Sequence, residues 1–288
     1  MKKIVLITGC ASGFGFLTAL KFARNGFETF ASVRNIKSEG VKELEKISKE
    51  ENLALHIIEI DVTSDVSVKK GIDIIKKKTK RIDILVNNAG FGFLGPIEEF
   101  TIEEIKQQYE TNIFGTLRMI KEVVPMMRKN KHGMIINLSS INGLVPFPLY
   151  GVYGSSKFAI ESLTETIRFE LSHFNIKVTM IEPGSFLSKF AKHINHPKGM
   201  LKTDSPYKKL TGRFFKKYHS AHDKAKENKV SDNLLHPQKV ADLIFKVSQK
   251  ENPKVRYRIG LDAHMYFILK KILPHSIWEW LLHKAYKW

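Results

Sequence analysis

The stretch TGCASGFG occupies residues 8–15 and follows directly on the apolar run Lys3–Thr8. The aliphatic and β-branched residues of that run predict a buried strand, and residues 16–25 have the pattern of a helix that Gly26 ends. Glycine is needed where a backbone turns tightly and where it must approach a pyrophosphate closely. A helix start adds unpaired N–H groups and the positive end of its dipole. The stretch therefore predicts a phosphate-binding turn.

Strand-like and helical patterns alternate along the chain after this turn. Alternation of this kind predicts βαβ units, and we expect an α/β, Rossmann-type doubly wound parallel sheet in a single domain of residues 1–288. A proline within the long helical pattern, Pro125, is expected to bend or divide that helix. The predicted strands are 29–33, 54–60, 84–86, 133–138, 177–181 and 256–259, and the predicted helices are 41–51, 66–78, 103–129, 153–174 and 237–250.

The composition is that of a globular protein with a basic C-terminal third. Its 288 residues include 47 Lys+Arg and 29 Asp+Glu, for a formal net charge of +18. Residues 1–184 contribute +4 of this charge and residues 185–288 contribute +14. A nucleic acid, an anionic membrane, an anionic ligand or a solvated lysine surface would each account for the excess. The chain carries no recognisable nucleic-acid-binding motif, so we expect no nucleic-acid partner.

Cysteine and histidine usage argues against a metal centre. The single cysteine, Cys10, excludes a disulfide framework and any multi-cysteine metal site. Two H-x-x-H pairs, His193/His196 and His219/His222, have no clear third ligand, so no metal site is predicted.

No segment of the sequence has the pattern of a membrane-spanning helix. The apolar run after Met1 is too short for a signal peptide, and no run approaches the roughly 18–20 apolar residues that a span needs. We therefore expect a cytoplasmic protein. The tail, residues 263–288, mixes basic and aromatic residues. Three roles remain open for this tail: weak peripheral membrane contact, cover for a substrate lid, or contact with a neighbouring subunit.

The end of the second strand indicates which nicotinamide cofactor is preferred. An acidic residue there would bind the ribose 2′-hydroxyl of NAD and repel a 2′-phosphate. The sequence instead has Ser32-Val33-Arg34-Asn35, and Arg34 is suited to a forked contact with a phosphate. Ser12 in the glycine turn adds a hydroxyl. We expect NADP rather than NAD, with a solvated surface position as the alternative for Arg34.

A tyrosine and a lysine stand four residues apart at Tyr153 and Lys157. On a helix they share one face, and an ammonium near a phenol lowers the pKa of the phenol. Tyrosine then becomes usable as a general acid or base near neutral pH. Ser140 lies thirteen residues upstream, just after a predicted strand, where its hydroxyl would hold a substrate carbonyl against the tyrosine.

Taken together, these segments resemble the short-chain dehydrogenase/reductase family, over about Lys3 to Gly184. The resemblance is carried by motifs in the family's order and spacing: TGCASGFG at 8–15, Asp61, NNAG at 87–90, Asn112, Ser140, YGSSK at 153–157 and Pro183-Gly184.

The resemblance implies a role for each matching catalytic position. Tyr153 would be the acid/base, Lys157 would lower its pKa and bind the nicotinamide ribose, and Ser140 would orient the carbonyl. Asn112 would hold a water in the proton relay. Ser139 is a neighbouring candidate for the serine, but the family's spacing favours Ser140.

The resemblance also implies the cofactor contacts. Asp61 and Asn88 would lie near the adenosine, and Pro183 and Gly184 near the nicotinamide. Phe14 stands where the family usually has a smaller aliphatic residue, and we expect that change to be tolerated. The predicted cofactor-binding residues are Gly9, Ser12, Gly13, Phe14, Gly15, Arg34, Asp61, Asn88, Ala89, Gly90, Tyr153, Lys157, Pro183 and Gly184.

The segment 185–236 falls where this family places its substrate lid. Long segments beside a crevice tend to be functional, and the aromatics here suit an apolar substrate, although packing against the core would explain them equally well. The length of this segment and the sequence around Arg34 look most like those of members that reduce or oxidise steroids, retinoids or other lipophilic ketones. The residues concerned are Phe186, Leu187, Phe190, Phe214, Phe215 and Tyr218.

The sequence thus predicts an NADP(H)-dependent oxidoreductase that transfers a hydride between the nicotinamide and a carbonyl or secondary alcohol. The expected substrate is a lipophilic small molecule. Family resemblance adds a homodimer or homotetramer, paired through the helices around 103–130 and 153–174. A non-catalytic NADP-binding regulator and a basic nucleic-acid-binding protein are the alternatives.

Overall fold

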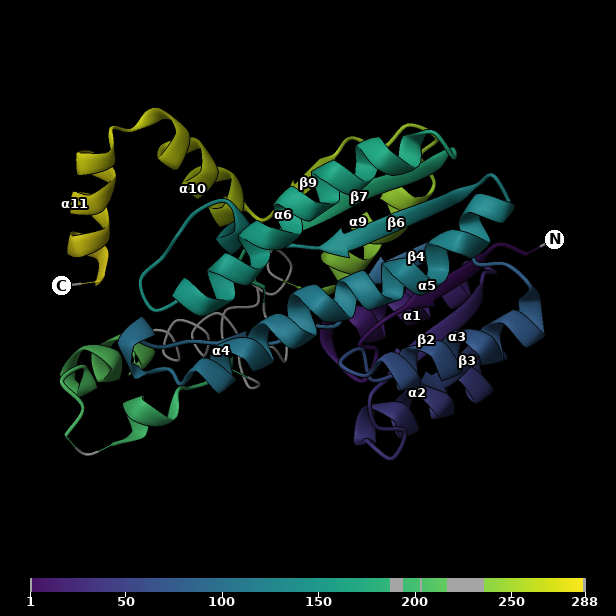
Figure 1. The fold of residues 1–288 in the computed structure, drawn as a ribbon, viewed down its shortest axis with the longest axis horizontal. Helices are drawn as coiled ribbons and strands as arrows, with labels where there is room; N and C mark the ends of the chain where they lie inside the picture. The colour runs from purple at the N-terminus through teal and green to yellow at the C-terminus, as the bar shows by residue number, and fades with distance from the viewer. Residues whose placement is uncertain (1, 187–193, 203, 217–235, 287–288) are drawn as a thin grey trace.

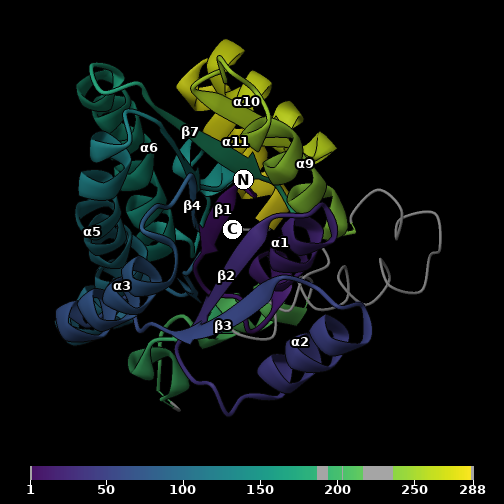
Figure 2. The same ribbon diagram turned by 90° about the vertical axis from the view of Figure 1, so that its right-hand side faces the viewer.

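A parallel sheet in the strand order β3-β2-β1-β4-β6-β7-β9 forms the centre of the protein (Figures 1 and 2). The computed structural model describes residues 2–186, 194–202, 204–216 and 236–286. All six neighbouring strand pairs are parallel, which confirms the predicted α/β class. The strands are β1 (Ile4–Ile7), β2 (Glu28–Val33), β3 (Leu55–Glu59), β4 (Ile84–Asn87), β6 (Gly133–Leu138), β7 (Ile176–Pro183) and β9 (Arg256–Ile259).

Helices cover both faces of this sheet (Figure 2). On one face lie α1 (Gly13–Arg24), α2 (Glu39–Glu50) and α9 (Gln238–Ser248). On the other lie α3 (Asp65–Thr79), α5 (Gly115–Lys129) and α6 (Gly151–Ser172). α1, α2, α3, α6 and α9 each coincide with a sequence-predicted helix to within a few residues, whereas α5 is only the second part of the predicted helix 103–129. The short elements are η1 (Ile97–Glu99), η3 (Ile141–Gly143), η5 (Lys198–Leu201) and the strand pair β5 (Gly92–Phe93) with β8 (Ile194–Asn195).

The hydrophobic core has two halves, one on each side of the sheet. Successive residues of β1 alternate between them: Val5 and Ile7 join the half under α1 and α9, and Ile4 and Leu6 join the half under α3 and α5. A parallel sheet covered on both faces needs apolar residues at every position of such a strand. This explains the unbroken run IVLI in front of the glycine turn.

The long helical region after residue 101 is divided, but not at Pro125. It comprises α4 (Ile102–Tyr109), one π-helical turn, η2 (Glu110–Phe114), and α5, which continues through Pro125. Of the two effects expected of this proline, a bend or a division, the division does not occur. Buried apolar residues on both sides of the proline, among them Val123 and Met126, pack into the core and hold the helix across the missing N–H donor.

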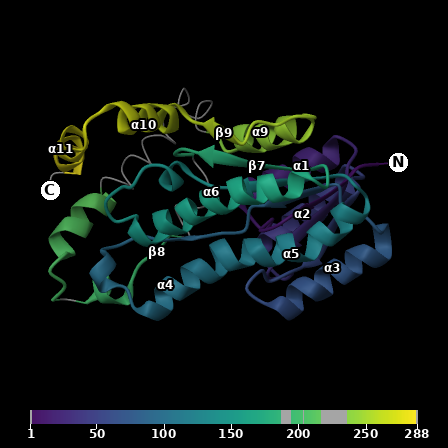
Figure 3. The ribbon, with the colours of Figure 1, turned by 45° about the horizontal axis from the view of Figure 1, so that its top comes forward.

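The chain's last described elements are α10 (Leu261–Ile272) and α11 (His275–Tyr286). Together they form a helical hairpin at the end of the molecule opposite the N-terminus (Figures 1 and 3). None of the helices in the described ranges has the length and apolar character needed to cross a membrane.

Candidate active site

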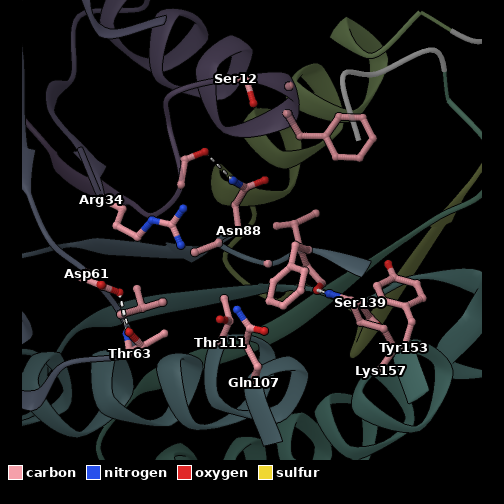
Figure 4. Close-up of a pocket in the computed structure, with 18 of the residues that line it drawn as sticks. Ser12, Arg34, Asp61, Thr63, Asn88, Gln107, Thr111, Ser139, Tyr153 and Lys157 are labelled. Atoms are coloured by element: carbon pink, nitrogen blue, oxygen red, sulfur yellow. Dashed lines mark hydrogen bonds between the residues drawn. The ribbon is translucent and has the colours of Figure 1, made fainter. Parts of the chain in front are cut away.

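A cavity of about 600 Å³ opens at the carboxyl ends of the central strands (Figure 4). The cavity adjoins the boundary between β1 and β4, where the strand order reverses: β2 and β3 follow on one side, and β6, β7 and β9 follow on the other. Ligands of open α/β sheets bind at such switch points. Most of the predicted site residues meet in its wall: Gly9, Ser12, Gly13, Phe14, Arg34, Asp61, Asn88, Ala89, Gly90, Tyr153, Lys157 and Pro183.

The glycine turn after β1 requires glycine for two different physical reasons. Gly9 and Gly13 have φ values of +71° and +60°, in the left-handed region that side chains disfavour. A Cβ on Gly9 would also lie 2.9 Å from the Cα of Ala89. Gly15 is not in the cavity wall; a Cβ there would lie 2.4 Å from the Nδ2 of Asn88. Gly15 therefore makes room for a neighbouring loop.

That loop, residues 87–90, is tied to the glycine turn by hydrogen bonds. The Asn88 side chain donates through Nδ2 to the carbonyl oxygens of Thr8, at 2.7 Å, and Gly9, at 3.1 Å. The backbone N–H groups of Asn88 and Ala89 donate in turn to the Thr8 hydroxyl, at 3.0 and 2.9 Å. The floor of the cavity is thereby fixed before any ligand binds.

A cation and a helix start face the same cavity. Arg34 is exposed at the end of β2, its side chain extends into the cavity (Figure 4), and it has no ion-pair partner within the described chain. α1 begins at Gly13, directly after Ser12, so its first N–H groups face the glycine turn. The Asp61 carboxylate instead accepts hydrogen bonds from the N–H and hydroxyl of Thr63, at 3.0 and 2.8 Å. These groups fit a dinucleotide that carries an additional phosphate near Arg34.

Tyr153 and Lys157 lie side by side at the other end of the cavity, on α6. Both side chains are almost buried, and the Lys157 Nζ lies 5.8 Å from the centroid of the Tyr153 ring. The Nζ also donates a hydrogen bond to the carbonyl oxygen of Leu138. Burial lowers the pKa of Lys157 to about 8, and the charge of Glu161 partly opposes this shift. A phenol and an ammonium held in this way can move a proton at a bound oxygen.

The two serines after β6 have different surroundings. Ser140 caps the start of η3, where its Oγ accepts hydrogen bonds from the backbone N–H and the Nδ2 of Asn142, at 3.2 and 3.3 Å. Ser139, not Ser140, is a residue of the cavity wall, and its Oγ lies 2.7 Å from where a Cβ on Gly143 would be. The structure thus brings both serines close to the site, with their hydroxyls in different environments.

Asn112 lies one layer behind the cavity wall, in the π-helical turn η2. Its Oδ1 accepts from the N–H of Phe91 at 3.1 Å, and its Nδ2 donates to the carbonyl oxygen of Phe91 and to the hydroxyl of Ser156, both at 3.1 Å. A Cβ on Gly90 would lie 3.1 Å from the same Oδ1. The π-helical turn therefore directs this amide to the backbone beside Lys157, and single π-helical turns occur frequently at functional sites.

The sequence analysis missed several residues of the cavity wall. Gln107 and Thr111 stand four residues apart and so share one helical face, a spacing that was readable from the sequence. Val62 and Thr63 follow directly on Asp61 at the end of β3. The other missed residues are Ile60, Phe91, Leu138 and Asn195.

The segment after β7 is described only in part. Gly184 contacts the start of α10, since a Cβ there would lie 2.1 Å from the Oδ1 of Asp262. Phe186 packs edge-on against Phe14, with ring centroids 6.0 Å apart. Phe214 is buried between other aromatic rings, which agrees with the core-packing alternative for that residue. The predicted positions Leu187, Phe190, Tyr218, His193, His219 and His222 lie outside the described residues.

A buried group of charges lies behind Lys157. Glu161, one turn further along α6, is 3.4 Å from the Nη2 of Arg256, and Glu182 on β7 is 3.2 Å from the Nε of the same arginine. Arg258 lies 3.0 Å from the other oxygen of Glu182. Burial raises the pKa of both Glu161 and Glu182. The group joins α6, β7 and β9 directly beneath the Tyr153–Lys157 turn.

Over the described ranges, no three His, Cys, Asp or Glu side chains cluster as a metal site would require.

Comparison with known proteins identifies the family. The family model described as short chain dehydrogenase matches residues 3–199. The uncharacterized oxidoreductase YusZ of Bacillus subtilis is 37% identical over 98% of both chains. The 3-ketodihydrosphingosine reductase of Bacteroides thetaiotaomicron is 33% identical over 99% of this chain and 98% of its own. A solved structure, the closed form of serine dehydrogenase complexed with NADP+, is 26% identical with a TM-score of 0.73, covering 89% of this chain and 94% of that one. The chain belongs to the short-chain dehydrogenase/reductase family of oxidoreductases.

Proposed function

We propose that the protein is an NADP(H)-dependent oxidoreductase that interconverts a carbonyl group and a secondary alcohol. The observation that carries the proposal is the nearly buried Tyr153–Lys157 pair, which opens on the same cavity as the glycine turn and Arg34. A proton-transfer pair at one end and a phosphate-binding turn at the other fit a cofactor bound along the cavity, with its reactive end beside Tyr153.

The bound nicotinamide supplies or accepts the hydride. In the direction of reduction, the Tyr153 phenol donates a proton to the substrate oxygen as the carbonyl carbon gains the hydride, so that one C–H and one O–H bond form. The Lys157 ammonium stabilises the phenolate left behind until a proton from solvent restores the phenol. Ser140 orients the carbonyl, and Asn112 fixes the backbone beside Lys157 and holds a water for proton return.

Arg34 is our basis for proposing NADP over NAD. The end of β2 carries this cation where an NAD-preferring site would have a carboxylate. Support comes from the similar serine dehydrogenase structure, which holds NADP+.

We propose a lipophilic ketone or alcohol as the substrate. Phe14 and Phe91 line the cavity, and Phe186 packs on Phe14. A relative of nearly equal length is named for the reduction of 3-ketodihydrosphingosine, a ketone of a lipid. The proposed setting is the cytoplasm.

We further propose a homodimer or homotetramer. Large apolar side chains are exposed on η2 and α6, namely Phe114, Phe158 and Phe169. The pairing would cover them.

The test is a panel of ketones, from short polar to long-chain, offered with NADPH and with NADH while nucleotide oxidation is followed. We expect turnover with NADPH, fastest for the lipophilic members. Tyr153→Phe should abolish turnover and leave NADPH binding intact. NADPH binding without turnover by any panel member would favour a regulator. Affinity for duplex DNA that falls steeply with salt would favour the nucleic-acid alternative.

A further inference from the structure

The outer face of the C-terminal hairpin carries a row of exposed apolar side chains. On α10, Leu261, Met265, Ile268 and Ile272 are 75%, 49%, 52% and 66% exposed. Their spacing of four, three and four residues places them on one side of the helix, in a single stripe. An exposed apolar stripe of this kind on a helix of a folded domain indicates a surface that binds another protein or a membrane.

The second helix also carries exposed apolar side chains and adds positive charge. Ile277 and Trp280 of α11 are 45% and 56% exposed, and the Lys284 Nζ lies 5.0 Å from the Trp280 ring. His264 and Lys271 are exposed beside the stripe on α10. We call these residues of α10 and α11 the outer face of the hairpin.

The inner face of the hairpin is fixed to the body of the protein. Trp278 is buried, and its ring lies 6.2 Å from that of Phe147 in the loop between β6 and α6. Tyr266 packs on the same phenylalanine at 5.0 Å, and the Arg258 guanidinium lies 3.6 Å from the Phe267 ring centroid. The hairpin cannot turn its apolar stripe inward without breaking these contacts, so the outer face stays directed away from the core.

The charges around the stripe indicate what covers it. The hairpin has two acidic residues: Asp262 accepts a hydrogen bond from the N–H of Ser185 at 2.7 Å, and Glu279 is exposed, with its nearest cation-forming group, the ring of His275, 4.0 Å away. The cations Lys271 and Lys284 are left facing outward with the apolar residues. A second copy docked on this face would bring two more lysines of the same charge to the interface, which is unfavourable. An anionic lipid headgroup layer complements them.

We propose that the outer face of the α10–α11 hairpin binds an anionic lipid surface. The apolar stripe enters the boundary between headgroups and acyl chains, and Lys271 and Lys284 contact the lipid phosphates. The helices lie in the plane of the membrane and do not cross it. Vesicle binding is measured without turnover, so its outcome does not depend on the proposed reaction.

The test is flotation of the full-length protein with phosphatidylcholine vesicles, with and without about one third phosphatidylglycerol, a fraction chosen to give a strongly negative surface. We expect the protein to float with the anionic vesicles and to be released as salt rises. Met265→Glu/Ile268→Glu should lower the partition at least about tenfold, because both side chains would be charged at the apolar boundary, and Lys271→Glu/Lys284→Glu should lower it similarly. Val66→Glu/Ile74→Glu on α3, at positions 78% and 48% exposed, is the matched control and should float like wild type.

Three results would overturn the proposal. The first is wild-type protein that floats with neither vesicle, a measurement that needs no variant to fold. The second is equal loss of flotation in the α3 control. The third is a change from dimer to monomer on Met265→Glu/Ile268→Glu with vesicle binding unchanged, which would assign the outer face to a second copy. Unchanged thermal unfolding of each variant shows that the fold is retained.

Discussion

The Nζ of Lys157 donates a 2.7 Å hydrogen bond to the carbonyl oxygen of Leu138, the last residue of β6. This bond joins helix α6 to the strand end that borders the cavity. It satisfies one donor of an ammonium that is almost buried, and a buried ammonium left without partners would be costly. It also fixes the ammonium beside the Tyr153 ring, which is the geometry on which the proposed proton transfer depends.

Lys157→Met tests the role of this ammonium. Methionine has a similar shape but no charge, so the variant should fold while the phenolate loses its stabilising cation. We expect kcat/KM to fall by about two to four orders of magnitude, the usual contribution of a general acid–base group. Steady-state kinetics with NADPH measures the loss, and Lys129→Met, at an exposed position on α5, is the control. Wild-type turnover by Lys157→Met would remove the lysine from the mechanism.

Arg34→Ala tests cofactor preference. On the proposed assignment, the variant loses a charge-assisted contact to the 2′-phosphate worth about 1.5–3 kcal/mol, so KM for NADPH should rise about 10- to 150-fold. KM for NADH should change little, because NADH has no such phosphate. The control is Lys37→Ala, which removes an exposed cation three residues further along the chain that does not line the cavity. An equal effect of Arg34→Ala on both nucleotides would contradict the assignment.

The parts of the site that follow from local backbone requirements were predictable from the sequence. Gly9 and Gly13 have positive φ, so their residue type alone indicates the turn. The run IVLI at 4–7 indicates a strand buried on both faces. Tyr153 and Lys157 share a helix face by spacing alone.

Features that depend on contacts between distant segments were not predictable in this way. Gly15 is needed in part because Asn88, more than seventy residues away, approaches it from another loop; the Gly9 carbonyl oxygen of its own turn is equally close. The two-residue strand pair β5–β8 has no periodicity to detect. The π-helical turn that directs Asn112 inward is stabilised by hydrogen bonds to Phe91 and Ser156, which only the folded chain brings together.

Ser140→Ala and Ser139→Ala form a matched pair that identifies the catalytic serine. If Ser140 orients the carbonyl, Ser140→Ala should lower kcat by about two orders of magnitude or more, with NADPH binding unchanged. Ser139→Ala should then have an effect of less than about tenfold. Ser139 is nevertheless the serine in the cavity wall, so the reverse order of effects would transfer the role to it. Binding of NADPH, followed by fluorescence, separates the loss of chemistry from damage to the site.

Glu161→Gln tests whether the buried charges beneath α6 tune the lysine. Where it is ionised, the Glu161 carboxylate raises the pKa of Lys157, which burial has lowered to about 8; burial raises the pKa of Glu161 itself, so this attraction grows as the pH rises toward the alkaline limb. The neutral amide removes that attraction, so the pKa of Lys157 should fall further, and the ammonium should be lost at a lower pH. The other groups that face Lys157 are the Tyr153 phenol on the same helix, the Leu138 carbonyl on β6 and the Asn112 amide beyond Gly90. All of them are unchanged in the variant.

The measurement is the pH profile of kcat/KM for NADPH, which reports the free enzyme. In the proposed mechanism, activity requires protonated Lys157, so it should be present below the lysine's pKa and decline as the pH rises through it. The alkaline limb of Glu161→Gln should therefore lie at lower pH than that of wild type. Glu165→Gln is the control, because Glu165 also pairs with Arg256 but lies a turn further along α6, where its carboxylate is half exposed. An equal shift in both variants would assign the effect to Arg256, and an unshifted limb in Glu161→Gln would mean that Glu161 serves only to hold α6 to β7 and β9.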